Sequence, residues 1–586
     1  MFRTNNCGEL TTKHVGQRVT IAGWVHRRRD HGGLVFIDLR DRAGLVQVVF
    51  NPETSGEVHD VATKLRHEYV LQVSGDVSRR PQGTENPNLP TGDIEVIAQE
   101  ARILNPSKTP PFYINEDSEV DENLRLRYRY LDLRRPRMRD NILLRHRVIK
   151  YMRDFLDDRG FIEIETPILI KSTPEGARDY LVPSRVHPGK FYALPQSPQQ
   201  LKQLLMVAGF EKYFQVARCF RDEDLRADRQ PEFTQLDIEM SFVDVEDILV
   251  LMEELFTSLV ETVTPAMRIV KPFPRLTYRD TMARYGTDKP DLRYGMEIRD
   301  LADIAAHTEF TVFLSALDAG GTVRGICAPA CAHYSRRQLD ELAEFVRERG
   351  AKGLITMPIG EEAARSIVGK FLTKEQRDEI AKRFGATEGD LLCIIAGETK
   401  MVEEALGALR VEMGHRLELV DPNHLVFCFI LDYPLLQKVE GDRWEPMHHP
   451  FTAPRDEDMY LLDSAPEKVY AKHYDLVCNG CEISSGSIRI HAADLQEKIF
   501  RLLGYSKAEV TQRFGHLLEA FEYGAPPHGG IAPGIDRMVM LLAGEDSIRE
   551  VIPFPKNKSA IDVMFDAPSE ISEEQLKELH LKLRLD

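Results

Sequence analysis

The chain has 586 residues, of which 42% are hydrophobic and 29% charged; this is typical of a folded globular protein and too long for a single ordinary core. Its net charge of −17 does not, as an average, favour a nucleic-acid partner. No apolar run reaches membrane-spanning length and the polar N-terminus has no signal-peptide core, so we predict a cytoplasmic protein of three or four domains without a membrane partner.

Basic charge is concentrated near the N-terminus. Positions 1–110 hold 14 Lys and Arg against 13 Asp and Glu, and positions 124–140 hold seven Arg against two Asp. This local distribution permits nucleic-acid contact without proving it.

The first hundred residues alternate apolar and polar positions in five short segments, which predicts a small β-barrel of the OB type. The segments are residues 19–25, 34–39, 45–50, 69–73 and 93–97. Alternation places Phe36 and Gln47 on the outer face, near Arg29. An exposed ring beside an exposed amide suits stacking and edge-reading of unpaired bases, but an ordinary surface Phe is an equally good interpretation of this segment alone.

A Pro- and Arg-rich stretch then predicts a hinge. Residues 142–158 repeat apolar side chains at helical spacing, Gly160 ends the helix, and residues 161–169 resume as a strand. The stretch from about 290 to 424 has helix and strand signals of its own, including a charged helix at 336–349. It predicts an inserted domain whose chemistry we cannot infer.

Apolar and polar side chains alternate on either side of a polar loop, in residues 212–221 and 233–242. This pattern predicts a long hairpin. One face of the second strand carries Leu236, Ile238 and Met240, and the other carries Phe233, Gln235, Asp237 and Glu239. Such a polar face is costly to bury, so we expect it to line a polar pocket; a solvated face is the alternative.

The eight scattered cysteines predict no disulfide framework. Cys327 with Cys331 and Cys478 with Cys481 are close pairs that together offer four zinc ligands. No second pair follows either one at ribbon-like spacing, and residues 478–482 look like a strand, so we expect no structural zinc.

Three ordered motifs resemble those of class II aminoacyl-tRNA synthetases: residues 160–167, residues 220–223 with 233–235, and residues 530–537. Within the class, residues 174–180, 196–202, 447–451 and 482–491 are similar to the bacterial-type aspartyl-tRNA synthetases, and the resemblance covers essentially the whole chain. One departure is that Ser484 and Ser485 precede Gly486 where the family usually has three glycines.

The resemblance implies an α+β multidomain fold. Its expected parts are an OB-fold anticodon-binding domain at 1–107, a hinge at 108–140, an antiparallel class II catalytic domain at 141–289 and 425–556, an inserted α+β domain at 290–424, and a C-terminal extension at 557–586. The helix and Pro167 of the first motif imply a homodimer.

The resemblance also implies the reaction: L-aspartate and ATP form aspartyl-adenylate and pyrophosphate, and aspartate then passes to the terminal adenosine of a tRNA. Arg221 and Arg537 are the expected catalytic residues. ATP is expected to contact Arg221, Asp222, Glu223, Arg229, Gln230, Phe233, Glu482, Gly534, Ile535, Asp536 and Arg537, with Mg²⁺ on Asp475 and Glu482.

Aspartate is expected to contact Glu175, Gln199, Gln200, Leu201, Lys202, Arg221, Asp237, His448 and Arg489. Arg489 would grip its side-chain carboxylate bidentately and Lys202 would supply a second charge. Ser197 and Pro198 predict the start of a helix that carries Lys202, with its leucines on the core side: Leu201, Leu204 and Leu205.

The expected anticodon contacts are Arg29, Phe36, Gln47 and Glu95. Family members that charge only tRNA(Asp) tend to carry Leu and Lys at the positions of His31 and Gly83, which we expect in loops at the barrel rim. His31 and Gly83 therefore predict a non-discriminating enzyme that charges tRNA(Asp) and tRNA(Asn). The alternative is an aspartate-specific enzyme in which the sequence has drifted at two loop positions without changing tRNA choice.

Other functions fit less well. A synthetase-like ATP-dependent amide ligase would lack the OB domain, and a non-catalytic OB-fold binder would not need Arg221 and Arg537. The related synthetases for asparagine and lysine need a neutral or acidic pocket where this chain has Arg489 and Lys202. We expect tRNA as the nucleic-acid partner, and no DNA.

Overall fold

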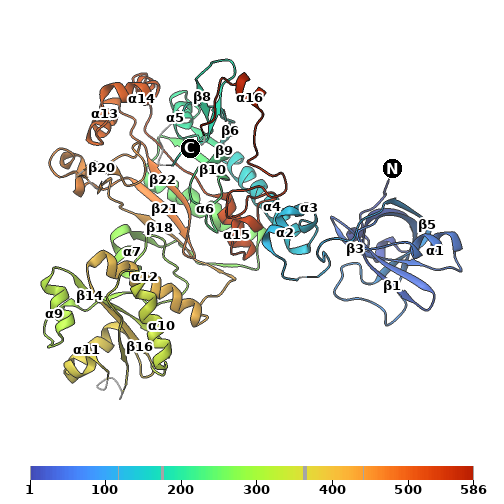
Figure 1. Cartoon of the computed structure of the whole chain (residues 1–586), viewed down its shortest axis with the longest axis horizontal. Helices are drawn as coiled ribbons and strands as arrows, with labels where there is room; N and C mark the ends of the chain where they lie inside the picture. The colour runs from blue at the N-terminus through green and yellow to red at the C-terminus, as the bar shows by residue number, and fades with distance from the viewer. Residues whose placement is uncertain are drawn as a thin grey trace. The chain divides into compact units, whose positions relative to one another are not determined.

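The computed structural model describes residues 2–116, 118–172, 177–360, 366–439, 441 and 443–584. The chain divides into two compact units, one made of Met1–Ile142 with Pro553–Pro568 and the other of Leu143–Ile552 with Ser569–Asp586 (Figure 1). Among the helices of these described residues, none is long and apolar enough to cross a membrane.

The first unit contains a closed five-stranded barrel in the order β1-β2-β3-β5-β4, as predicted. Its strands are β1 (Arg18–His31), β2 (Leu34–Asp41), β3 (Gly44–Phe50), β4 (Val70–Arg79) and β5 (Ile94–Asn105), with α1 (Gly56–Thr63) between β3 and β4. The predicted inward residues form the barrel core, because alternate positions of each strand face the same side. The helix α1 was not predicted.

The arginine-rich stretch that was predicted as a hinge contains helices: α2 (Glu122–Arg127), α3 (Arg129–Asp132) and the start of α4 (Pro136–Asp157). The buried carboxylate of Asp132 accepts from Arg125 at 3.0 Å and from Arg129 at 2.7 Å. Part of the basic charge in this stretch therefore compensates a buried acid and is not available to a nucleic acid.

The second unit is built on an eight-stranded sheet in the order β12-β18-β21-β22-β23-β10-β9-β6. Its strands are β12 (Arg275–Thr277), β18 (Phe427–Leu431), β21 (His473–Cys478), β22 (Cys481–Ile488), β23 (His528–Ile531), β10 (Glu232–Ser241), β9 (Lys212–Phe220) and β6 (Ile162–Glu163). The pairs are antiparallel except β12 with β18 and β6 with β9 at the two edges.

One face of this sheet is apolar and the other is polar. Side chains of α4, α6 (Val245–Val263) and α15 (Ile535–Ala543) pack with Leu236 and Ile238 of β10 in one hydrophobic core. The opposite face of β10 carries the buried carboxyl groups of Asp237 and Glu239. The predicted hairpin of β9 and β10 is thus confirmed, and its polar face is enclosed rather than solvated.

The strand predicted at 478–482 is interrupted by a tight turn, with Cys478 at the end of β21 and Cys481 and Glu482 at the start of β22. Asn479 and Gly480 join β21 to β22, and Cys478 pairs with Cys481 across the turn. Gly480 has φ +80°, which explains glycine at the second turn position.

The region predicted as an insertion contains its own four-stranded sheet, in the order β13-β14-β16-β15, with helices on both faces (Figure 1). Its elements are β13 (Arg299–Asp300), α8 (Ala302–Ala305), α9 (Thr311–Asp318), β14 (Thr322–Ala328), α10 (Arg336–Arg347), β15 (Ile355–Pro358), α11 (Lys374–Phe384), β16 (Leu391–Gly397) and α12 (Thr399–Arg416). The charged helix predicted at 336–349 is α10.

The remaining elements connect or flank the two sheets. They are β7 (Leu181–Pro183), β8 (Phe191–Ala193), α5 (Gln199–Val207), β11 (Arg268–Ile269), α7 (Tyr278–Tyr285), β17 (His424–Leu425), β19 (Leu436–Val439), β20 (Arg443–Pro446), α13 (Ala493–Leu502), α14 (Lys507–Phe521) and α16 (Glu573–Glu578).

Candidate functional site

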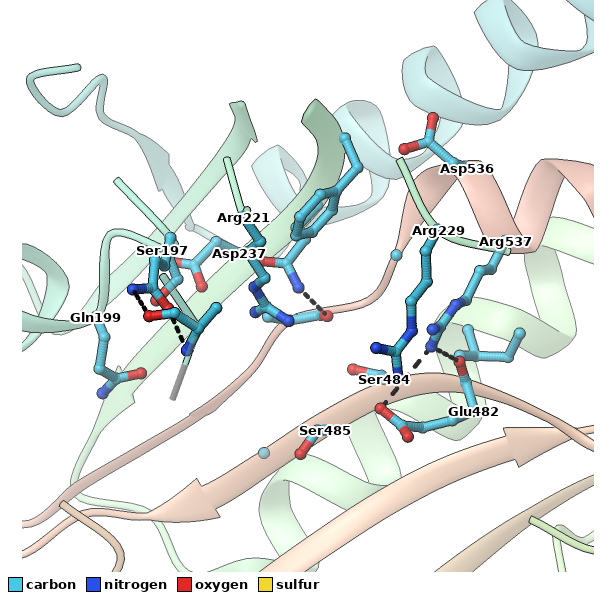
Figure 2. A pocket seen from close by; sticks show the side chains of 18 of the residues that line it. Ser197, Gln199, Arg221, Arg229, Asp237, Glu482, Ser484, Ser485, Asp536 and Arg537 are labelled. Carbon is cyan, nitrogen blue, oxygen red and sulfur yellow. Dashed lines mark hydrogen bonds and ion pairs between the residues drawn. The ribbon is translucent and has the colours of Figure 1, made fainter. Parts of the chain in front are cut away.

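A cavity of about 460 Å³ lies on the polar face of the eight-stranded sheet (Figure 2). It brings together most of the predicted substrate-binding residues: Gln199, Lys202, Arg221, Glu223, Arg229, Gln230, Phe233, Asp237, His448, Glu482, Arg489, Gly534, Asp536 and Arg537. Five predicted residues do not line it: Gln200, Leu201, Asp222, Asp475 and Ile535. Glu175 lies outside the described residues.

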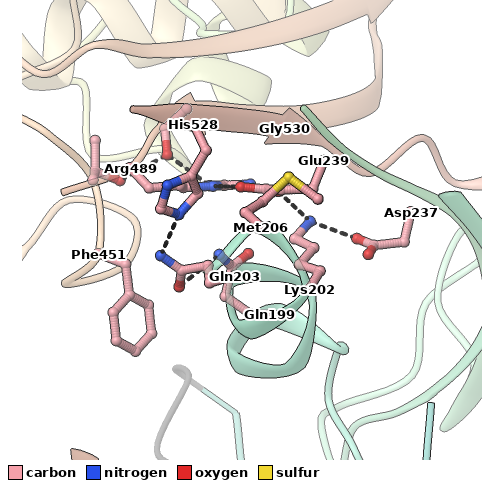
Figure 3. Close-up of polar contacts among 12 residues, drawn as sticks. Gln199, Lys202, Gln203, Met206, Asp237, Glu239, Phe451, Arg489, His528 and Gly530 are labelled. Atoms are coloured by element: carbon pink, nitrogen blue, oxygen red, sulfur yellow. Dashed lines mark hydrogen bonds and ion pairs between the residues drawn. The ribbon is translucent and has the colours of Figure 1, made fainter. Parts of the chain in front are cut away.

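One end of the cavity is a buried network of two cations and two anions (Figure 3). The Lys202 Nζ lies 2.6 Å from Asp237 Oδ1 and 3.2 Å from Glu239 Oε2. The Arg489 guanidinium donates to both oxygens of Glu239, at 3.0 and 3.1 Å. All four side chains are at most 2% exposed, and the two positive charges balance the two negative charges. Removing one member of such a network leaves an unpaired buried charge, which costs about 3–5 kcal/mol.

Glycine at position 530 makes room for this network. A Cβ at Gly530 would lie 2.0 Å from Glu239 Oε2, so the carboxylate occupies the space of the missing side chain. Although burial opposes it, Arg489 and Lys202 lower the pKa of Glu239 to about 2. Burial raises the pKa of Asp237. Glu239, which the sequence placed only on a sheet face, is therefore the shared anion of the two cations.

The guanidinium of Arg489 is already largely engaged. Besides Glu239, its Nη1 contacts Ser487 Oγ at 2.7 Å and His449 Nε2 at 3.0 Å. Burial and the adjacent Arg489 hold the pKa of His449 well below its ordinary value, so this imidazole is neutral and can accept from the guanidinium. A substrate carboxylate that binds Arg489 bidentately must therefore displace one of these neutral partners.

The helix α5 faces the cavity with Gln199 and Lys202, as predicted, but its leucines do not form a core side. Its buried residues include Gln199, Lys202 and Gln203, whereas the leucines predicted on the core side are only half-buried. The reason is that α5 packs against the polar face of the sheet. Gln203 extends the network, since its Nε2 lies 3.1 Å from the Nε2 of His528 in β23 and its Oε1 accepts from Gln199.

The other end of the cavity carries Arg229 and Arg537, and Arg221 lies between the two ends (Figure 2). The Arg221 guanidinium lies over the Phe233 ring, 5.1 Å from its centroid. Arg537 donates to the Glu482 carbonyl at 2.7 Å and pairs with Asp228 at 3.0 Å. Among the described residues, Arg221 has no ion pair with a carboxylate, so its charge is available to an anion.

Two acidic residues predicted to contact ATP also have structural partners. Asp536 accepts from Arg145 at 2.5 Å and from the Thr234 amide at 2.8 Å, which fastens α15 to α4 and β10. The Asp222 amide donates to the Arg178 carbonyl at 3.1 Å, so Asp222 ties the end of β9 to the segment that follows residues 173–176.

An acidic pair lies beside the arginine end. Asp475 is buried and accepts from the Tyr433 hydroxyl at 2.7 Å, and His473 Nε2 lies 2.9 Å from it. Burial, and then the negative Asp475, raise the pKa of Glu482. A cation between two such carboxylates would relieve their repulsion.

Histidines next to Asp475 do not form an obvious metal site of their own. His448, His473 and Asp475 each offer a ligand atom within 4.8 Å of the others. However, the two imidazole rings stack with centroids 3.5 Å apart at 15°, so their in-plane lone pairs run side by side rather than converging on one ion. His448 faces the cavity as a neutral ring, because burial lowers its pKa to about 3.

The two serines that depart from the family pattern precede a glycine that the packing requires, and the buried hydroxyl of Ser484 has no hydrogen-bond partner among the described residues. A Cβ at Gly486 would lie 2.4 Å from the Gly530 carbonyl and 2.5 Å from the Tyr474 ring, so glycine is needed there. Ser484 and Ser485 line the cavity on the same strand, β22, where small side chains leave it open.

The predicted anticodon residues form a connected polar cluster on the outside of the barrel. Arg29 contacts Asp38 at 2.6 Å and Gln47 at 3.2 Å, and Gln47 donates to Glu95 at 2.9 Å. Gln47 is only 7% exposed and Phe36 is half-buried, so the prediction that both are exposed is wrong. Gln47 does face away from the barrel core, but Arg29 and Glu95 cover it.

The two residues predicted to set tRNA choice are both exposed. His31 is the last residue of β1 rather than part of a loop, and Gly83 lies in the connection between β4 and β5. Gly83 has φ +87°, a conformation that favours glycine, and its amide donates to Glu85 at 2.8 Å.

We expect the protein to lose stability as the pH falls below about 6.5. Burial, with Arg40, lowers the pKa of His26 to about 4, and burial lowers the pKa of His449 and of His528. An unfolded chain binds protons at these imidazoles below pH 6.5, and because their pKa values are lowered the folded chain binds fewer, so stability falls as the pH falls. Thermal denaturation should show a lower midpoint at pH 5.5 than at pH 7.5; an equal or higher midpoint contradicts this.

Several further cavity residues were not predicted as site residues, although most lie within the segments that resemble the family. They are Ala177, Gln196, Ser197, Leu225, Asp228, Gln235, His449, Phe451, Ile483, Ala532 and Ile548. Gln235 shares the polar face of β10 and could have been included on alternation alone. Ile483 lies on β22 and Ile548 in a short 3-10 helix, and the others lie in loops and turns, which alternation does not describe.

Family models match both parts of the chain. Residues 121–558 match the model described as tRNA synthetases class II (D, K and N), and residues 19–104 match the OB-fold nucleic acid binding domain. The chain is 59% identical over 597 residues to the aspartate–tRNA(Asp/Asn) ligase of Dehalococcoides mccartyi, with 100% of each covered. It is 56% identical over 585 residues to that of Syntrophomonas wolfei, again with 100% of each covered.

A solved structure shares the fold at low sequence identity. The asparaginyl-tRNA synthetase from Pyrococcus horikoshii, complexed with asparaginyl-adenylate, has a TM-score of 0.60 and 20% identity, covering 95% of this chain and 98% of that one. At this identity the match supports the fold alone.

Proposed function

The chain belongs to the class II tRNA synthetases of the aspartate, lysine and asparagine group, and we propose that it uses ATP to join L-aspartate to tRNA(Asp) and tRNA(Asn). The predicted fold class is confirmed, with an OB-fold barrel and a class II catalytic sheet. The observation that carries the proposal is a single cavity that joins a buried Lys202 and Arg489 pair to Arg221 and Arg537. Charging of tRNA serves translation, so we place the enzyme in the cytoplasm.

Aspartate is selected at the end of the cavity that holds the charge-balanced network. Its side-chain carboxylate would bind Arg489 and Lys202, whose orientation Glu239 fixes. Its ammonium would bind Asp237 and Gln199, with His448 closing the pocket. An asparagine amide or a lysine ammonium would place donors against these cations, which disfavours both.

ATP would lie across the arginine end. Phe233 offers one ring face to the adenine, and Arg537 would stack on the other while reaching the γ-phosphate. Glu223 would fix the adenine, and Arg229 and Gln230 would hold the phosphates. Gly534 would lie against the nucleotide at the start of α15. Asp536, in the first turn of the same helix, accepts a hydrogen bond from Arg145 and so holds the helix in place.

The activation step takes place between aspartate at one end of the cavity and ATP at the other. An oxygen of the aspartate α-carboxylate attacks the α-phosphorus, a P–O bond forms, and the bond to the pyrophosphate oxygen breaks. Arg221 lies between the ends and carries no carboxylate partner among the described residues, so it can neutralise the reacting carboxylate and the α-phosphate together. The terminal adenosine hydroxyl of the tRNA then attacks the aspartyl carbonyl and AMP leaves.

A magnesium ion fits the acidic pair. Asp475 and Glu482 supply the hard carboxylate oxygens that Mg²⁺ prefers. Burial, and then the negative Asp475, raise the pKa of Glu482, and a cation would offset the repulsion between the two carboxylates. We propose that these two residues hold Mg²⁺, which would neutralise phosphate charge when bound.

The barrel would bind the anticodon through its polar cluster. Arg29, Gln47 and Glu95 present a pre-ordered set of donors and acceptors, beside a half-buried Phe36 on which a base can stack. His31 and Gly83 would leave room for either base at the position where the two anticodons differ.

The function is tested by ATP–pyrophosphate exchange with single amino acids. Exchange should depend on L-aspartate and should be absent with L-asparagine, L-glutamate or L-lysine. Exchange supported equally by asparagine or lysine would contradict the assignment of the cationic pocket.

We further propose a homodimer that pairs through the first motif. Next to Pro167, the apolar side chains of Ile168 and Leu169 are 40% and 51% exposed, which is typical of a surface that a partner covers. Sedimentation at micromolar concentration should show twice the chain mass of 66.9 kDa. Ile168→Asp should shift the protein toward monomer, whereas the same change at the exposed Ile367 should not; a monomeric wild-type protein contradicts the proposal.

A further inference from the structure

We propose that Lys289, in the loop that enters the insertion, binds the terminal phosphates of ATP and the pyrophosphate formed from them. This inference rests on the proposed function and adds a residue that the motifs do not contain. The Lys289 Nζ lies 3.9 Å from Oε2 of Glu482, a carboxylate that lines the arginine end of the cavity. Lys289 thus lies at the edge of the site although it is far from every motif in the sequence.

The backbone that carries Lys289 is held firmly from the side of the insertion. Arg410 of α12 is 1% exposed and donates to the carbonyls of Asp291 at 2.8 Å, Tyr294 at 2.7 Å and Gly295 at 3.0 Å. Its guanidinium also lies 4.3 Å from the centroid of the Tyr294 ring. A buried arginine that satisfies three carbonyls fixes the course of this loop.

The same loop packs against the strand turn that leads to Glu482. A Cβ at Gly480 would lie 3.5 Å from the Asp291 Cβ and 3.9 Å from the Lys289 carbonyl, which is ordinary contact distance. Asp291 is itself held by Arg293, whose Nη2 lies 2.6 Å from it. The loop and the β21–β22 turn therefore form one surface, and the position of Lys289 relative to Glu482 follows from that packing.

The Lys289 side chain, in contrast, is free to move. It is 46% exposed, and its contacts with Glu482 and Asp288 are both loose, at 3.9 Å. A lysine carries a compact charge on a flexible stem, so it can turn from a carboxylate to a phosphate over a few ångströms. Without nucleotide, Lys289 faces Glu482. When nucleotide is bound, the phosphates carry more negative charge than this carboxylate, and Lys289 turns toward them.

The charges at the arginine end of the cavity favour a further cation that binds phosphate. Arg537 is shared between Glu482 and Asp228, and Arg229 pairs with Glu223 at 3.1 Å, so both arginines already face carboxylates. Pyrophosphate leaves with more negative charge than it carries within ATP, and an additional cation at the edge of the cavity would stabilise it. The insertion would then contribute directly to the ATP site through the loop that enters it.

The test measures pyrophosphate affinity in aspartate-dependent ATP–pyrophosphate exchange. Lys289→Met should raise the KM for pyrophosphate about five- to ten-fold and leave the KM for aspartate within two-fold of the wild-type value. Lys289→Arg should restore the KM for pyrophosphate to within about two-fold. The matched control Lys352→Met removes an exposed lysine from the insertion and should behave as wild type.

An unchanged KM for pyrophosphate in Lys289→Met overturns the inference. So does a parallel rise in the KM for aspartate with a lower denaturation midpoint, because that combination indicates a structural role. Wild-type protein without aspartate-dependent exchange would instead contradict the proposed function itself, and the two failures are therefore distinct.

Discussion

Replacing Arg489 by leucine should abolish aspartate-dependent ATP–pyrophosphate exchange while leaving ATP binding largely intact. The lost contact is a charge-assisted hydrogen bond to a buried carboxylate, which contributes about 1.5–3 kcal/mol or more, so a loss of at least ten- to 100-fold is expected. Glu482 lies near the start of β22 and Arg489 directly follows its end, and this separation is why nucleotide binding should persist. Exchange and equilibrium ATP titration on the same preparation measure the two effects.

A second variant separates substrate binding from folding. Arg489→Leu leaves Glu239 buried with Lys202 as its remaining cation, which strains the network as well as removing the substrate contact. The double variant Arg489→Leu with Glu239→Gln restores the charge balance. We expect it to recover the denaturation midpoint but not aspartate activation. Surviving exchange with aspartate in either variant would contradict the assignment of Arg489.

The combined change His31→Leu with Gly83→Lys should lower charging of tRNA(Asn) at least ten-fold and leave charging of tRNA(Asp) within two-fold. The larger side chains would close the space that accepts either base, and one unfavourable contact of about 1–3 kcal/mol is sufficient. Initial rates with the two purified tRNAs at equal concentration give the comparison.

The conformation of Gly83 requires its own control. Lysine at φ +87° is strained, so Gly83→Lys can act by moving the loop rather than by its side chain. Gly83→Ala imposes the strain without the long side chain, and a Cβ there meets open space. If Gly83→Ala alone lowers charging of both tRNAs equally, distortion of the loop accounts for the effect, and the proposed discrimination is wrong.

Alternation along strands predicted the barrel and the β9–β10 hairpin, because inward and outward faces follow directly from a period of two. The same pattern placed Asp237 and Glu239 on a polar face. It could not show that Glu239 meets Arg489, since 250 positions separate the two residues. Long-range pairing of this kind is a property of the assembled sheet.

Predictions from local sequence patterns were wrong where a helix packs against a polar surface instead of an apolar core. The leucines of α5 were predicted to face the core, but α5 packs on a polar sheet face and buries Lys202 and Gln203 instead. Asp222 and Asp536 follow the family motifs, and their structural hydrogen bonds could not be predicted from those motifs. Lys289 has no local signal, because the loop that enters the insertion reaches Glu482 only in the folded protein. The domain boundaries and the roles of the site residues stay predictions.

The central claim is that one cavity activates aspartate for two tRNAs. The most direct measurement charges purified tRNA(Asp) and tRNA(Asn) side by side with radiolabelled aspartate and wild-type enzyme. We predict that both tRNAs are charged, and that the product on tRNA(Asn) carries aspartate. If tRNA(Asn) stays uncharged at enzyme concentrations that saturate tRNA(Asp), the enzyme is aspartate-specific and the claim is contradicted.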